Sequence, residues 1–105
     1  MLYVSEKFIV EKQNALCNDG ATIKTSDECK KAAKVFNKAV DFGMDEDFLF
    51  VFMEEQKKSD FPKGCYYINE NNINQVFFNS DESDPNFTGQ NNDDAYPICR
   101  GKMVT

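Results

Sequence analysis

Four cysteines are the residues of this chain whose spacing most restricts its chemistry. They are Cys17, Cys29, Cys65 and Cys99, and the chain has no histidine. Structural zinc sites need pairs of ligands a few residues apart, and a nucleophilic cysteine needs a histidine or another cationic neighbour. An even number of widely spaced cysteines in a small acidic domain instead predicts two disulfide bonds and an oxidising compartment. Free buried thiols in an intracellular protein are the alternative.

Carboxylates in the last quarter of the chain offer a second kind of chemistry. Calcium takes hard oxygen ligands, and several acids lie close together there, although no segment has the EF-hand spacing or its glycine. The calcium candidates are Asp81, Glu82, Asp84, Asp93 and Asp94. Their alternative role is that of solvated loop residues, and we expect no resident cofactor.

Catalysis and sugar binding can also be read from residue types. Glycoside hydrolysis needs two acids across a cleft, but nothing selects such a pair, and a domain of 105 residues rarely builds a deep cleft. We therefore expect a protein that is not an enzyme. Tyr66, Tyr67 or Tyr96 could stack on a sugar ring, although the chain has no Trp and buried tyrosines are the alternative.

One modification site is encoded in the polar segment near the C-terminus. Asn86-Phe87-Thr88 is an N-glycosylation sequon. It predicts glycosylation of Asn86 and agrees with secretion.

The charge balance excludes several classes of partner. The net charge is −6, and residues 39–105 carry thirteen acidic against five basic side chains. Nucleic acids and anionic membrane surfaces attract basic patches, so we expect neither as a partner. No apolar run approaches the length of a membrane span. A hydrophobic content of 41% suits one domain, residues 1–105, with a modest core.

The N-terminus conflicts with secretion. Residues 1–10 lack the basic start, long apolar stretch and cleavage site of a signal peptide. We expect that Met1 opens a mature chain or a fragment of a longer one. If Met1 is the native start, an intracellular or virus-encoded protein, including a virion protein, is favoured instead.

The clearest local pattern predicts a helix over about 26–39. Thr25 and Glu28 have the spacing of a capping box. One apolar stripe follows at helical spacing, and lysines cover the opposite face as a solvated surface. The stripe is Cys29, Ala32, Ala33 and Phe36, and the lysines are Lys30, Lys31, Lys34 and Lys38.

Strand patterns occupy most of the remaining chain. Residues 2–10 suit a short edge strand or packed arm, and Asn18-Asp19-Gly20 predicts a turn. The apolar run 48–53 predicts a central strand, with a helix over 46–58 as the rival. Residues 66–68 and 73–79 predict a hairpin with an Asn-rich tip. We divide the chain into an arm (1–16), a stapled core (17–99) and, within it, an acidic loop (80–95).

Four cysteines allow three pairings. Cys29 faces the core from the helix, and Cys65 enters a strand that should pack beneath it, so we favour Cys29–Cys65. Cys17–Cys99 then joins the two ends of the module. The local pairing, Cys17–Cys29 with Cys65–Cys99, stays open.

Several of these residues together resemble a small module of large secreted proteins in algae and other protists. The pattern covers residues 17–99 and contains the four cysteines together with Ile23, Ser26, Ala32-Ala33, Pro62-x-Gly64, Val76-Phe77-Phe78-Asn79 and Pro97-Ile98. The resemblance implies an extracellular module and assigns no functional residue. Segment 40–58 and the arm are where this chain departs from the pattern.

The sequence thus predicts an α+β domain, with one main helix on a small, mostly antiparallel sheet stapled by two disulfides. The expected function is a non-enzymatic extracellular module that recognises a protein or a glycan. The alternative is a structural subunit of a filament, a surface layer or a virus, whose segments 2–10 and 48–53 are buried against neighbouring modules or subunits. Self-association through exposed apolar surface would distinguish the second from the first.

Overall fold

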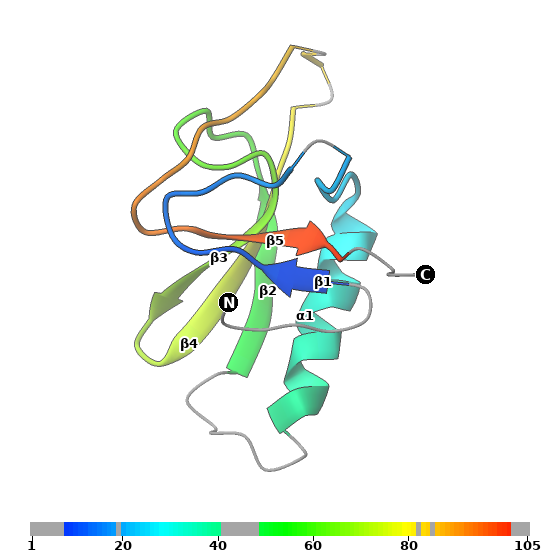
Figure 1. The fold of residues 1–105 in the computed structure, drawn as a ribbon, viewed down its shortest axis with the longest axis vertical. Coiled ribbons are helices and arrows are strands. Elements are labelled where there is room, and N and C mark those ends of the chain that lie inside the picture. The colour runs from blue at the N-terminus through cyan, green and yellow to red at the C-terminus, as the bar shows by residue number, and fades with distance from the viewer. Residues whose placement is uncertain (1–7, 19, 41–48, 82, 85, 102–105) are drawn as a thin grey trace.

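The protein folds as one helix on one face of a five-stranded sheet (Figure 1), in a computed structural model that describes residues 8–18, 20–40, 49–81, 83–84 and 86–101. The strand order is β1-β5-β3-β4-β2. In chain order the elements are β1 (Phe8–Val10), α1 (Ser26–Val40), β2 (Leu49–Gln56), β3 (Gly64–Glu70), β4 (Ile73–Asn79) and β5 (Tyr96–Arg100). The predicted α+β class and two disulfides are confirmed, and the sheet is larger than the small sheet expected.

Helix α1 begins where the capping residues predict. The hydroxyl oxygen of Thr25 accepts a hydrogen bond from the backbone N–H of Glu28 at 3.2 Å, which satisfies one of the free N–H groups of the first turn. The acids in this turn, Asp27 and Glu28, complement the positive end of the helix dipole. The stripe from Cys29 to Phe36 is buried against the sheet. The helix is confirmed, and it ends one residue later than predicted.

The predicted hairpin is confirmed as β3 and β4, which pair antiparallel with Glu70 opposite Ile73. The two residues between them, Asn71 and Asn72, have φ angles of 55° and 64°. Positive φ at both central positions is characteristic of the two-residue hairpin turn whose twist matches that of the flanking strands. Asn adopts positive φ more readily than most residues.

Strand β2 lies at the edge of the sheet, so the prediction of a central strand is wrong, as is the rival helix. Within the described residues β2 pairs only with β4, in parallel. Phe50 is 2% exposed beneath the helix, whereas Leu49 and Val51 face the other way and are exposed. An apolar run can therefore mark an edge strand whose outer face is uncovered. Residue 48 lies outside the described residues.

The arm contributes a strand to the same sheet. β1 pairs antiparallel with β5, placing Ile9 opposite Cys99. Phe8 and Val10 point into the core and are 4% and 1% exposed. Residues 1–7 lie outside the described part of the chain.

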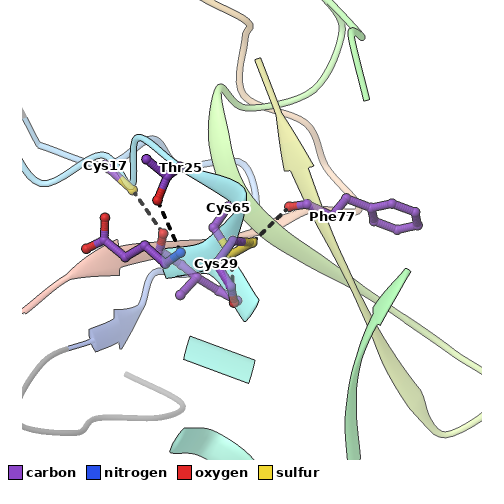
Figure 2. The surroundings of a disulfide bond; sticks show 7 residues. Cys17, Thr25, Cys29, Cys65 and Phe77 are labelled. Carbon is purple, nitrogen blue, oxygen red and sulfur yellow. Dashed lines mark hydrogen bonds between the residues drawn. A yellow bond between two sulfur atoms is a disulfide. The ribbon is translucent and has the colours of Figure 1, made fainter. Parts of the chain in front are cut away.

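The two predicted disulfides are both present, and Figure 2 shows the surroundings of Cys29–Cys65. Cys29–Cys65 ties α1 to β3 in the centre of the core, where the Cys29 sulfur lies 3.5 Å from the carbonyl oxygen of Phe77. Cys17–Cys99 ties the segment before the helix to β5. The favoured pairing is confirmed, and the local pairing is excluded. The predicted turn after Asn18 is also confirmed, with the N–H of Ala21 donating to the carbonyl of Asn18 at 2.9 Å, and Asp19 itself lies outside the described residues.

Candidate interaction surface

The sheet has two faces, and only one of them is covered by α1. The opposite face, which we call the outer face, carries a small second core around Tyr66. The Tyr66 ring stacks between Phe61, at a centroid distance of 5.2 Å, and Phe77, at 5.5 Å. Ala95 and Ile68 complete this cluster. Aromatic stacking of this kind adds to the free energy gained from burial alone.

A loop covers this end of the outer face, and Asn79 holds the loop in place. The Asn79 side chain is fully buried. Its oxygen accepts a hydrogen bond from the N–H of Lys58 at 2.7 Å, and its nitrogen donates to the carbonyl oxygens of Lys58, Phe61 and Pro62 at 2.7, 3.1 and 3.0 Å. One amide therefore fixes the connection between β2 and β3.

Gly89 lets the long polar loop pack onto this connection. Its φ is +62°, and a Cβ there would lie 2.5 Å from the carbonyl oxygen of Phe61 and 2.6 Å from the nitrogen of Lys63. The neighbouring N–H of Gln90 donates to the Phe61 carbonyl at 3.0 Å. A larger residue at position 89 would separate the two backbones.

The other end of the outer face is open and apolar. Leu49, Val51 and Met53 of β2 are 44%, 37% and 49% exposed, and Ile73 of β4 is 38% exposed. The parallel register places Leu49 beside Ile73. We call these four residues the outer patch. They result from strand alternation, because Phe50 and Phe52 take the positions facing the helix.

Acidic side chains border the outer patch. Glu70, the last residue of β3, pairs with Ile73, and Glu54 follows Met53 after a shift in the β2–β4 register. Burial raises the pKa of the Tyr66 phenol, and the negative charges of Asp60 and Glu54 raise it further. The neutral hydroxyl donates a hydrogen bond to the side-chain oxygen of Gln56. The patch is thus apolar at its centre and negative at its margin.

Two of the three tyrosines considered for sugar stacking, Tyr66 and Tyr67, are buried. Tyr66 and Tyr67 are 0% and 2% exposed. Tyr96 is half-buried, and its ring stacks on Tyr67 at 4.7 Å. Tyr66 and Tyr67 are therefore core residues, and their use as stacking platforms is wrong.

The calcium candidates are engaged in local turns where the structure describes them. The Asp81 carboxylate accepts hydrogen bonds from the hydroxyl and N–H of Ser83, which hold its pKa below the usual range. Asp84 accepts the N–H of Asn86 at 2.9 Å. Asp93 and Asp94 are exposed. No group of three His, Cys, Asp or Glu is placed to hold a metal ion among the described residues, and Glu82 lies outside them.

The sequon and the lysine face both lie on the surface. Asn86 is exposed in a turn that closes with the N–H of Phe87 donating to the carbonyl of Asp84. Lys30, Lys31 and Lys34 are exposed on α1. The side chain of Lys38 lies outside the described part.

No protein-family model matches this chain, and no match was found among curated proteins or solved structures. Among the described residues, no helix is long and apolar enough to cross a membrane.

Proposed function

We propose that the protein is a non-enzymatic extracellular recognition module that binds a protein partner through the outer patch. The observation that supports this function is the grouping of four large aliphatic side chains, each more than one third exposed, on two neighbouring strands. Contiguous apolar surface with a polar margin is typical of protein interfaces.

The charge at the margin selects the kind of partner. Glu54 and Glu70 are exposed beside the patch, and the whole chain has a net charge of −6. A partner with an apolar centre and a basic margin is complementary to this surface. A second copy would bring the same carboxylates against themselves, so we propose a different protein. A glycan is less well supported because Tyr66 and Tyr67 are buried.

Two observations support an extracellular location. Both disulfides connect segments distant in sequence, and such bonds persist in oxidising compartments. The module pattern seen in the sequence also belongs to secreted proteins. Its residues Cys29, Cys65 and Asn79 hold the core together rather than line the outer patch. We therefore propose that the resemblance concerns the scaffold, with recognition added on the open face.

The alternative function, a structural subunit, uses the same patch for assembly. The arm, the other segment expected to contact neighbouring subunits, is less suited to assembly than expected. Phe8 and Val10 are already buried in the protein's own sheet. In the described part of the apolar run, residues 49–53, only Leu49, Val51 and Met53 are exposed.

The experiment compares three immobilised proteins: the wild type, Met53→Lys and Leu16→Lys. Leu16 is 50% exposed and lies outside the patch, so its variant is a matched control for adding a lysine in place of an exposed apolar residue. Extracellular fluid from the source organism is passed over each immobilised protein, and the proteins that bind are identified by mass spectrometry.

We expect a partner that the wild type and Leu16→Lys retain and that Met53→Lys retains about tenfold less, the effect of losing one well-packed interface contact. Equal retention by all three would contradict the proposed site. A wild-type oligomer that Met53→Lys dissociates would support the structural subunit instead. Circular dichroism checks that each variant is folded.

A further inference from the structure

A concave surface lies at the opposite end of β4 from the outer patch. It is a hollow of about 420 Å³ lined by residues of the segment before α1, the start of β3 and the end of β4. Thr22 and Ser80 contribute hydroxyl groups, and Phe78, which is 5% exposed, also borders the hollow. This volume and mixed lining are those of a site for a small polar molecule.

The hollow is basic although the chain is acidic. Lys24 and Lys63 line it and are exposed, and no carboxylate is among its described lining residues. An adjoining hollow of about 560 Å³ shares Phe78 and Ser80 and adds Lys57 and Glu55. Asp81 also approaches Lys57, at 4.0 Å. The positive charge is therefore concentrated at Lys24 and Lys63.

The backbone that carries these two lysines is tightly constrained. Gly64 has a φ of +95°, and a Cβ there would lie 2.8 Å from the Thr22 methyl carbon and 3.1 Å from the carbonyl oxygen of Ile23. The two segments that carry Lys24 and Lys63 are therefore closely packed against each other. The adjacent Cys29–Cys65 bond locks α1 to β3 immediately beyond them. A site whose backbone is fixed before binding loses less entropy when its ligand arrives.

We propose that this hollow binds a sulfated saccharide, with the sulfate ester between Lys24 and Lys63. The hydroxyls of Thr22 and Ser80 suit the polar edges of a sugar ring. Lysine ammonium groups act as point charges for a tetrahedral anion. The adjoining hollow beside Lys57 provides room for a second sugar unit. This site is independent of the outer patch.

The test titrates the labelled protein with a heparin-derived tetrasaccharide and follows the backbone amides by NMR. The amides of Thr22, Gly64 and Ser80 should shift. The same tetrasaccharide without sulfate, and sodium sulfate, are the ligand controls. The variant is Lys24→Glu/Lys63→Glu. Its control is Lys31→Glu/Lys34→Glu, which makes the same change of net charge at exposed positions on the helix.

We expect the first double variant to bind the sulfated tetrasaccharide about tenfold more weakly than the wild type and the second to bind within about twofold. Equal weakening of both variants would show a general charge effect and overturn the site. Equal binding of the desulfated tetrasaccharide would overturn the role of the sulfate ester. Sodium sulfate binding as tightly as the tetrasaccharide would show an anion site without saccharide recognition. The Met53→Lys protein should bind the tetrasaccharide normally, which separates this site from the proposed function.

Discussion

The side-chain amide of Asn37 on α1 forms two hydrogen bonds with the backbone of Phe50 on β2. Its nitrogen donates to the Phe50 carbonyl oxygen at 2.6 Å, and its oxygen accepts the Phe50 N–H at 2.7 Å. β2 is an edge strand, so this amide takes the place that a neighbouring strand would occupy. Exposed strand edges invite pairing with other chains, and proteins commonly block them. Asn37 blocks this edge beside the aromatic residues Phe50 and Phe52.

We predict that Asn37→Ala lowers the free energy of unfolding and promotes self-association. The substitution removes both hydrogen bonds between the Asn37 side chain and the Phe50 backbone, and each such loss costs about 1–3 kcal/mol where the polar group stays buried. It also opens the β2 edge. Urea unfolding measures the first effect, and sedimentation velocity at increasing protein concentration measures the second.

Lys34→Ala is the matched control, because Lys34 lies one turn earlier on the same helix and is exposed. It should remain monomeric and nearly as stable as the wild type. A monomeric Asn37→Ala protein at high concentration would show that the edge is protected by something other than this amide.

Asn79→Ala should be among the most destabilising single substitutions in the chain. It removes the side-chain partner of the Lys58 N–H and of the Lys58 and Pro62 carbonyl groups, whereas the Phe61 carbonyl keeps its hydrogen bond from the Gln90 N–H. We expect a loss of about 3 kcal/mol or more, the effect of leaving several buried polar groups unpaired. Asn74, also buried on β4, has a side-chain nitrogen without a hydrogen-bond partner among the described residues. Asn74→Ala should therefore cost less in parallel urea titrations, and the reverse order would contradict the central role of Asn79.

Local sequence patterns predicted those parts of the fold that depend on short-range contacts. The Thr25–Glu28 spacing predicts the start of α1, and Asn71-Asn72 allow the hairpin turn because both adopt positive φ. The Cys29–Cys65 pairing followed from the helix stripe. The place of β2 could not be predicted in this way, because residues 49–53 do not encode which strand they pair with. Its parallel partner β4 lies beyond an intervening strand.

The candidate surfaces depend on long-range packing and were not predicted. Leu49, Val51 and Met53 have the alternation of a half-exposed strand, but their exposure requires β2 to lie at the edge with its outer face uncovered. Lys24 and Lys63 are 39 positions apart and line the same hollow because Gly64 packs against Thr22. The missed sequence signal was the glycine before Cys65, which marks a close backbone approach.

We predict that the ion pair between Glu28 and Arg100 makes stability depend on acidic pH. Two hydrogen bonds from the Arg100 guanidinium, at 2.7 and 2.6 Å, together with its charge, hold the pKa of Glu28 below its ordinary value of 4.5. The folded protein therefore releases this proton more readily than the unfolded chain. The stabilisation is present above pH 4.5 and is lost as the pH falls through the folded pKa.

Urea unfolding of the wild type, Glu28→Gln, Arg100→Gln and the double variant between pH 3 and pH 7 tests this contribution. Each single variant should flatten the stability profile on the acid side of about pH 4.5, and the double variant should resemble either single one. If Glu28→Gln keeps the wild-type slope, the acid sensitivity arises from other carboxylates.

The two disulfides allow a comparison between chain entropy and core packing. In the chain-entropy model, Cys17–Cys99 contributes about 4.5 kcal/mol because it joins residues 82 apart, and Cys29–Cys65 about 4 kcal/mol because it joins residues 36 apart. Packing reverses this order. Cys29 and Cys65 are 0% and 1% exposed in the centre of the core, so their removal also leaves a cavity.

We therefore predict that Cys29→Ala/Cys65→Ala is less stable than Cys17→Ala/Cys99→Ala, although its closed loop is the shorter one. Cys99 is also buried, at 1% exposed, but Cys17 is only partly buried, so the second variant removes one buried sulfur rather than two and damages the core less. Urea unfolding of both double variants measures the difference, and intact mass before and after reduction confirms that each retains its other bridge. The opposite order would mean that loop closure outweighs the cavity. In that case the role of Cys29–Cys65 at the centre of the core would be mainly to hold α1 against β3.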